Sequence, residues 1–251
     1  MKSPLDFERC LTFINCQLQP HGRSPTLLRP AIVRQAVTIS RQAGCGALVI
    51  GQKVAEYLQN RSTTDAVPWT VFDRNLVQKV LEDHDLPKRL AGHMPEDRIL
   101  QISDILEELC GLHPPSWYLV KQTADTILHL AELGNVILIG RASNIITSRL
   151  DYVFHVRLIG SLKKRLEHVQ QFNQLNREQA MECIRSRDTG RRRYVKKYFH
   201  KDIDDPLLYH LVINTDLVPC EHAARIIGNA VLSRVTVPPP SNLSVPALLT
   251  K

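Results

Sequence analysis

The stretch that most constrains the fold is residues 36–58, where an apolar run leads into a glycine-containing turn and then into a helical pattern. Residues 36–39 predict a short buried strand, and the apolar residues within 48–58 recur at helical spacing. Gly44 and Gly46 permit backbone angles and close approaches that a side chain would prevent. The free N–H groups and the dipole at the start of such a helix attract an anion. This order favours phosphate binding, although many strand-turn-helix units bind no phosphate.

The turn differs from the standard phosphate-binding loop, G-x-x-x-x-G-K-[ST], whose Lys reaches the outer phosphates and whose hydroxyl holds Mg²⁺. Here Gly46 is followed by Ala47 and Leu48, so this loop has neither group. Arg41 lies at the start of the turn and is the candidate to supply the missing charge. We interpret Cys45 as a substitution for Ser rather than as a nucleophile, because no His lies nearby in sequence.

Composition is typical of a soluble globular protein, with 43% apolar and 23% charged residues. No apolar run approaches the ~20 residues that a bilayer-spanning helix needs, so we expect no membrane association. Acidic residues within the first ten positions disfavour a secretory signal, and we expect a cytoplasmic location. The six cysteines form no C-x-x-C pair, and the ten histidines show no ligand spacing, so we assign no metal to protein side chains.

The net charge of +7 is concentrated in one segment. Between Arg185 and Lys201 there are eight basic residues and one acidic residue, and the rest of the chain is balanced. An even basic coat would indicate nucleic acid, whereas one basic segment in a neutral body indicates a localised anion site. The alternative is a solvated helix face with no ligand.

The order of the predicted elements selects an α/β fold with a mainly parallel sheet and right-handed crossovers. Ligands of such sheets bind at the carboxyl ends of the strands, so we expect the polar residues after three strands to converge: 41–46, 73–74 and 140–141. We predict an N-terminal extension over 1–34, one domain over 35–235 and a Pro-rich tail over 236–251. The five predicted strands are 36–39, 69–72, 136–139, 152–158 and 211–213.

Four short blocks in this order resemble the cytidylate kinase-like family, a branch of the P-loop nucleoside monophosphate kinases. They are 38–42, 72–74, 140–144 and 188–199, the last followed by Asp-Pro at 205–206 and by 211–215. The resemblance implies a three-layer P-loop kinase-like fold with a five-stranded parallel sheet and a helical lid at about 185–201. It also implies transfer of a phosphoryl group from ATP to CMP or dCMP, with Mg²⁺ carried by the ATP.

The residues and the resemblance together give a set of candidate site residues. The catalytic candidates are Arg41, Asp188 and Arg191. The candidates for the ATP phosphate-binding loop are Gly44, Cys45, Gly46, Ala47 and Leu48. The candidates for binding the nucleoside monophosphate are Asp73, Arg74, Gly140, Arg141, Asn144 and again Asp188, and the lid candidates are Arg187, Arg192, Tyr194 and Lys196.

Each pair of polar residues has a simpler interpretation. Asp73 and Arg74 also fit a helix cap followed by an exposed base, and 140–141 also fits a turn glycine with a surface arginine. Asp188 and Arg191 are three residues apart, so on a helix they can form a weak surface pair.

The loop departs from the family pattern, which usually reads G-S-G-G-R where this chain has 44–48 as G-C-G-A-L. Leu48 therefore replaces a family arginine. Three functions remain open: a working nucleoside monophosphate kinase, a nucleotide-binding protein of the same fold that has lost catalysis and has a regulatory role, and an RNA-binding protein. The composition disfavours the last, although Tyr194, Tyr198 and Phe199 interleave with the basic residues and can stack on bases. The oligomeric state is left open.

Overall fold

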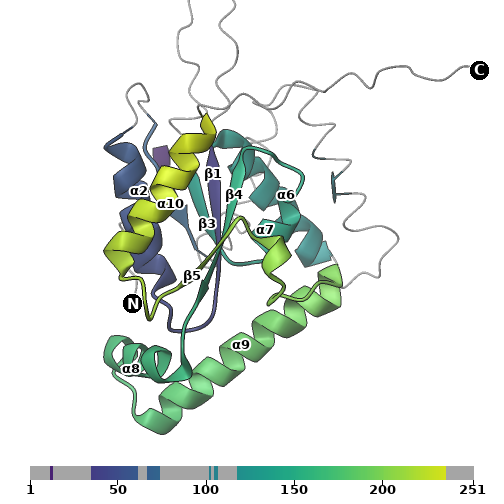
Figure 1. Cartoon of the computed structure of the whole chain (residues 1–251). Coiled ribbons are helices and arrows are strands. Elements are labelled where there is room, and N and C mark those ends of the chain that lie inside the picture. The colour runs from purple at the N-terminus through teal and green to yellow at the C-terminus, as the bar shows by residue number, and fades with distance from the viewer. Residues whose placement is uncertain are drawn as a thin grey trace, which may run out of the picture.

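The computed structural model describes residues 12–13, 35–61, 67–73, 102, 105–106 and 118–235. Its centre is a five-stranded parallel sheet of order β2-β3-β1-β4-β5 (Figure 1). The α/β fold class is therefore confirmed. The strands are β1 (Ala36–Arg41), β2 (Thr70–Phe72), β3 (Val136–Ile139), β4 (Val153–Ile159) and β5 (Leu211–Asn214).

Helices cover both faces of the sheet. The described helices are α2 (Ala47–Gln59), α6 (Tyr118–Leu133), α7 (Ser143–Ile146), α8 (Leu162–Asn173), α9 (Arg177–Phe199) and α10 (Cys220–Val235), with a 3₁₀ turn, η2 (Pro206–Leu208). Among them, none combines the length and the apolar character that crossing a membrane requires.

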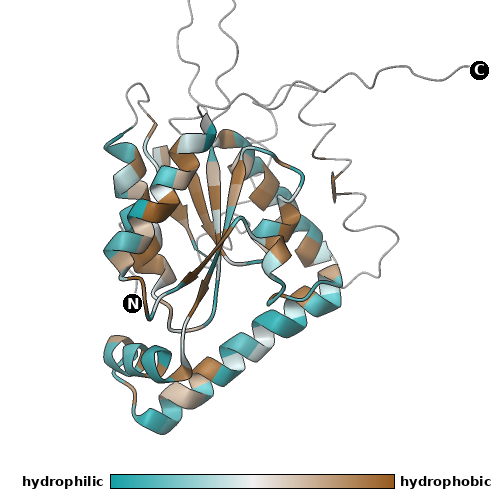
Figure 2. Ribbon diagram, in the orientation of Figure 1, coloured by the Kyte–Doolittle hydropathy of each residue, from teal (hydrophilic) through white to brown (hydrophobic). Residues whose placement is uncertain are grey.

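The alternation of side chains along the strands separates two apolar cores. Val37 and Ile39 of β1 face α2 and α10, while Ala36 faces α6 and α7. Every residue of β3 is buried, because helices cover that strand on both sides. Hydropathy follows this arrangement: the strands are apolar, and α9 is mostly polar along its length (Figure 2).

Two helices, α8 and α9, begin with clear capping chemistry. The Ser161 side chain accepts a hydrogen bond from the backbone N–H of Lys164 and begins α8. Asn176 and Gln179 form a capping box at the start of α9, each side chain accepting from the other's backbone N–H.

The predicted extension 1–34 and tail 236–251 lie outside the described residues, apart from Thr12 and Phe13. Phe13 is fully buried in the core beside α6, where its ring meets that of Phe72 edge to face at 5.8 Å. At least this side chain of the predicted extension is therefore part of the domain core.

Candidate active site

The candidate site lies at the carboxyl ends of β1, β3 and β4. Because all strands run parallel, the loops that follow them meet at one edge of the sheet, and α9 crosses that edge (Figure 1). The helix is anchored at both ends: Ala180 and Ile184 pack with α8, while Val195 and Phe199 belong to the main core. Its middle therefore spans the strand ends.

The loop between β1 and α2, residues 42–46, contains Gly44 and Gly46 and is called the glycine loop below. It packs closely against α8. Gly44 has φ 90°, and a Cβ on it would lie 2.6 Å from the carbonyl oxygen of Arg165, so no other residue fits. Gly46 has φ 67° and immediately precedes α2. Leu48, on the first turn of α2, packs partly against the core between α2 and α10, so its side chain supplies packing rather than charge. Burial raises the pKa of the Cys45 thiol, which does not suit a nucleophile.

Asp188 of α9 reaches into the start of the glycine loop. Its Oδ1 accepts a hydrogen bond from the backbone N–H of Ala43 at 2.7 Å and from Arg191 Nη1 at 3.0 Å. Its Oδ2 accepts from Arg165 Nη1 at 2.6 Å, and Arg165 also donates to the carbonyl oxygens of Ala43 and Gly160. The Asp188 carboxylate thus joins α8, α9 and the loop.

Arg41 lies against the turn after β3. Gly140 has φ 88°, and a Cβ on it would lie 1.9 Å from Arg41 Nη1, so the absence of a side chain there makes room for the guanidinium. Burial and the neighbouring charge of Arg191 lower the pKa of Arg41 to about 9, while Asp73 opposes that shift. Burial also lowers the pKa of Arg191, which Asp188 partly offsets. Two arginines therefore share a desolvated region.

Arg157 projects from the middle of β4 into the same region. Its Nη1 donates to Ser40 Oγ at 2.8 Å and its Nη2 to Asp204 Oδ1 at 2.6 Å. The other oxygen of Asp204 accepts from Arg192 Nη2 at 2.8 Å. Adjacent residues of α9, Arg191 and Arg192, thus bind two different carboxylates.

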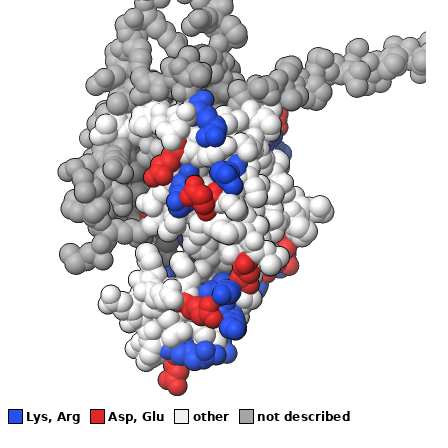
Figure 3. Space-filling view, turned by 60° about the vertical axis from the view of Figure 1, so that its left-hand side comes forward, with Lys and Arg blue, Asp and Glu red and all other residues white. Residues whose placement is uncertain are grey.

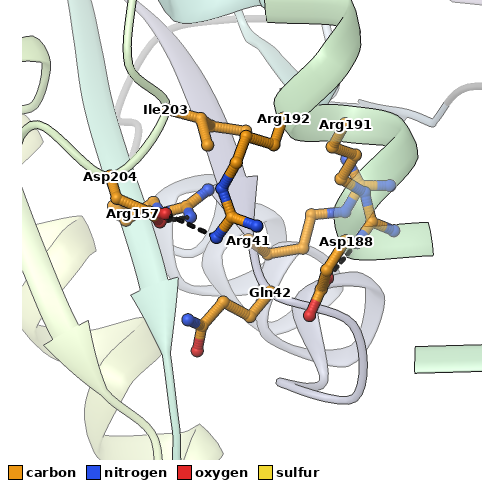
Figure 4. Close-up of a pocket in the computed structure, with 8 residues that line it drawn as sticks. All are labelled: Arg41, Gln42, Arg157, Asp188, Arg191, Arg192, Ile203 and Asp204. Carbon is orange, nitrogen blue, oxygen red and sulfur yellow. Dashed lines mark hydrogen bonds and ion pairs between the residues drawn. The ribbon is translucent and has the colours of Figure 1, made fainter. Parts of the chain in front are cut away.

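These charged groups surround a small cavity (Figure 4). Its volume of about 20 Å³ has room for a single water molecule and none for a phosphate group. Asp188 and Asp204 pair with three of the surrounding arginines, Arg157, Arg191 and Arg192. The cavity is lined by Arg41, Gln42, Arg157, Asp188, Arg191, Arg192, Ile203 and Asp204.

Comparison with known proteins identifies the family. The sequence profile of the cytidylate kinase-like family matches residues 36–217, from β1 to the turn after β5. The chain belongs to the cytidylate kinase-like family. A crystal structure of an uncharacterized protein from Eubacterium ventriosum ATCC 27560 has a similar fold, with a TM-score of 0.62 and 16% identity over 80% of this chain and 99% of that chain. Comparison with curated proteins gives no match.

Family membership makes this chain a kinase-like nucleotide-binding protein. The structure brings together four of the residues predicted from sequence, Arg41, Asp188, Arg191 and Arg192, beside the predicted glycine loop. Gly140 supports Arg41, and Asp73 is buried at the end of β2, close enough for its charge to act on Arg41.

The remaining predicted residues do not line the cavity or lie outside the described part of the chain. Arg141 has φ 56° in the turn between β3 and α7, and Asn144 is buried in α7. Arg187 and Lys196 are exposed on α9. The ring of Tyr194 contacts those of Tyr198 and Phe199 and packs on the core. Arg74 lies outside the described residues.

Sequence reasoning missed Arg157, Asp204 and Arg165. The sequence did contain an indication for Arg157. His155 and Arg157 are polar residues two positions apart in an otherwise apolar strand, so their side chains lie on the same face of the sheet. Asp204 and Arg165 had none, because their roles depend on partners 47 and 23 residues away in sequence.

The described residues contain no group of three or more His, Cys, Asp and Glu side chains that would hold a metal ion. Asp188 and Asp204 are already bound by arginines.

Charges on one face of the described part of the molecule are mixed (Figure 3). On the face that Figure 3 shows, Lys and Arg side chains lie beside Asp and Glu side chains rather than gathering into one basic patch. The described residues on this face therefore form no continuous positive stripe of the kind typical of nucleic-acid binding.

Proposed function

We propose that this protein transfers the γ-phosphoryl group of ATP to a pyrimidine nucleoside monophosphate, CMP or dCMP. The proposal combines the kinase-like family with the arginines that converge at the strand ends. Phosphoryl transfer needs little covalent help from the protein, because aligning the phosphates and neutralising their charge lowers the barrier. Arginines at the strand ends suit that task.

One observation carries the proposal: Arg41, Arg157 and Arg191, from β1, β4 and α9, line one desolvated cavity. Burial and like charge lower the pKa of Arg41 to about 9, so its charged form is disfavoured there without an anion. A bound polyphosphate would instead favour the charged form, because each guanidinium would then face negative oxygens.

The sheet order suggests how two nucleotides would be arranged. The donor phosphates would lie at the glycine loop and the start of α2. The acceptor would lie toward β2 and β3, near Asp73, Gly140, Arg141 and Asn144. An acceptor phosphate oxygen forms a bond to the γ-phosphorus while the bond from that phosphorus to the β–γ bridging oxygen breaks, and ADP leaves. Arg41 and Arg191 would stabilise the charge that develops.

Mg²⁺ would enter on the ATP, neutralise part of the phosphate charge and keep several waters. We assign it no protein ligand.

A second candidate, a nucleotide-binding protein without turnover, is favoured by Ala47 and Leu48. These aliphatic residues begin α2 at the position where related loops place a cation. Such a protein would bind ATP through the arginines and transfer nothing.

A coupled assay that detects ADP tests the two candidates with Mg-ATP and each of CMP, dCMP, UMP and AMP. The proposal expects ADP production that depends on CMP or dCMP. Measurable ATP binding with no turnover on any acceptor would replace the first candidate by the second. Absence of nucleotide binding together with micromolar binding of single-stranded RNA at physiological salt would overturn both.

A further inference from the structure

Arg157 belongs to a row of polar pairs between β1 and β4. Parallel pairing sets Thr38 beside His155 and Ser40 beside Arg157. Because alternate residues of a strand point to the same face, the two hydroxyls of β1 meet the two polar residues of β4 on one face of the sheet. Thr38 Oγ1 lies 2.8 Å from His155 Nδ1, and Arg157 Nη1 donates to Ser40 Oγ at 2.8 Å. Of the two pairs, the second contains a residue that lines the small cavity, Arg157.

Two partners hold the Arg157 guanidinium, and they differ in burial. Nη1 bonds Ser40, which is 7% exposed and lies within the sheet. Nη2 bonds Asp204, whose side chain is 40% exposed and is shared with Arg192 (Figure 4). Asp204 lies in the segment between α9 and η2, so an anion in the cavity would compete with it for the guanidinium. Ser40 is therefore the anchor that such a ligand would leave in place.

Tyr209 sets the direction of the Ser40 hydroxyl. The Tyr209 hydroxyl donates to the carbonyl oxygen of Ile203 at 2.8 Å, and its oxygen lies 3.3 Å from Ser40 Oγ. A phenol has one proton and a carbonyl can only accept, so the Ser40 hydroxyl supplies the proton between the two hydroxyl oxygens. The lone pairs of Ser40 Oγ are then left for Arg157. The four residues thus form one directional chain of hydrogen bonds, in which each bond orients the next.

The backbone holds Tyr209 from both sides. Its N–H donates to the carbonyl oxygen of Pro206 in η2, and the next N–H, that of His210, donates to the carbonyl oxygen of His155 in β4. Burial raises the pKa of the Tyr209 phenol, so the phenol stays a donor at neutral pH. The hydroxyl at the end of the chain is therefore fixed by the fold itself.

This chain leaves part of the Arg157 guanidinium available to a ligand. Arg157 is 4% exposed, and its Nε has no hydrogen-bond partner among the described residues. A buried N–H without a partner is costly, so an acceptor supplied by a ligand would be favoured there. Arg41 and Arg191 line the same cavity, and among these positive groups an anionic oxygen is the acceptor that suits the N–H best.

We propose that Tyr209 is a positioning residue for phosphoryl transfer: through Ser40, its hydroxyl holds the Arg157 guanidinium in the orientation that meets the transferred phosphoryl group. This inference rests on the proposed function.

Steady-state kinetics of Tyr209→Phe with Mg-ATP and CMP test the inference, because the change removes the phenol oxygen and keeps the ring. We expect kcat to fall roughly ten-fold and both KM values to stay within about two-fold, since a displaced guanidinium affects the developing charge more than the bound substrates. Tyr57→Phe is the matched control, because it removes a phenol that donates to Asn229 Oδ1 at 2.6 Å between α2 and α10. Its kcat should equal that of the wild type.

A double-mutant comparison separates positioning from a general structural effect. Arg157→Lys keeps the positive charge and removes the fork that bonds Ser40 and Asp204 together. In this variant we expect Tyr209→Phe to cause no further loss of kcat. A loss of the same size with and without Arg157, or an unchanged kcat in Tyr209→Phe, would overturn the inference.

A second readout needs no turnover. In protein made with isotope-labelled arginine, the Nε–H resonance of Arg157 is identified by its absence from the Arg157→Lys variant. Tyr209→Phe and Ser40→Ala should each speed the exchange of this proton with water by roughly ten-fold or more, because the guanidinium loses its fixed orientation. Tyr57→Phe should leave the exchange unchanged. An inactive wild type would reject the proposed function, whereas unchanged exchange in Tyr209→Phe would overturn this inference alone.

Discussion

At the scale of single residues, the position of Arg41 depends on the glycine that follows β3, Gly140. Gly140 has φ 88° and leaves the space that Arg41 Nη1 occupies. The turn after β3 therefore sets where the guanidinium points.

Gly140→Ala should lower the free energy of unfolding by ~1–3 kcal/mol, because Ala is strained at this φ. It should also weaken ATP binding, because the new methyl group displaces Arg41. Urea unfolding and titration with Mg-ATP measure the two effects. Gly190→Ala is the control, since nothing lies within 4 Å of a Cβ there and α9 should keep or gain stability. Unchanged ATP affinity in a folded Gly140→Ala variant would show that ATP binding does not depend on the present position of Arg41.

Leu48→Arg should raise transfer activity by placing a cation over the phosphates. Losing a comparable charge-stabilising donor typically costs about 10²–10³-fold in kcat, so even partial recovery is measurable. The Leu48 side chain is only partly buried, so an Arg can turn toward the loop at modest cost. Turnover measured in the coupled assay, with Leu48→Gln as the uncharged comparison, gives the answer. Equal rates for the Arg and Gln variants would mean that Arg41 already fills the role.

His155 should make stability depend on pH. Its ring is buried, with Nδ1 2.8 Å from the Thr38 hydroxyl, and burial, followed by His210 and Arg234, lowers its pKa from 6.5 to about 3. Between these values the unfolded chain binds a proton that the folded chain excludes. The contribution of neutral His155 to the free energy of unfolding is therefore fully present above pH 6.5. It falls as the pH drops toward 3, with a slope of up to roughly 1.4 kcal/mol per pH unit.

Urea unfolding at pH 7, 6 and 5 tests this dependence. His155→Gln should reduce the dependence of the free energy of unfolding on pH. His222→Gln, at an exposed position, should leave that dependence unchanged. Parallel profiles for His155→Gln and the wild type would show that His155 takes up its proton without unfolding.

At the scale of elements, two ion pairs fix the middle of α9 where it crosses the strand ends. Two carboxylates, Asp188 and Asp204, bind its adjacent residues Arg191 and Arg192. The stretch from Arg185 to Arg193 contains no buried residue, and Gly190 lies in its middle. Only the two ends of the helix contribute apolar burial, so the ion pairs hold the middle in place.

We expect Mg-ATP together with CMP to slow amide exchange in the segment 185–193 more than at the anchored ends. Phosphates would replace the aspartates as partners of the arginines, and polyanion binding would stabilise the highly charged middle of the helix. Hydrogen exchange with and without the two nucleotides measures this, and the second half of α10, which packs with α2, is the internal reference. Equal protection in both states would assign α9 a fixed structural role and remove its role as a lid.

At the scale of the whole molecule, the sequence predicts what depends on local patterns. The uniformly apolar β3, the Ser161 and Asn176 caps and the glycine loop are all visible in short stretches, and they are enough to define the sheet and its ligand edge. The contact of Asp188 with the Ala43 N–H spans 145 residues and depends on how α9 crosses the strand ends, which no local pattern encodes. The same holds for Asp204, whose partners come from β4 and α9.

The central claim is that Arg41 and Arg191 promote phosphoryl transfer between nucleotides, and direct detection of products tests it. Wild-type protein incubated with Mg-ATP and CMP should form ADP and CDP in equal amounts, as resolved by chromatography. Arg41→Gln and Arg191→Gln should lose most of this activity, at least about 100-fold if each stabilises the transferred charge. Arg193→Gln, at an exposed position of the same helix, should retain it. Formation of CDP that is undiminished in the first two variants, or absence of CDP with the wild type, would contradict the account.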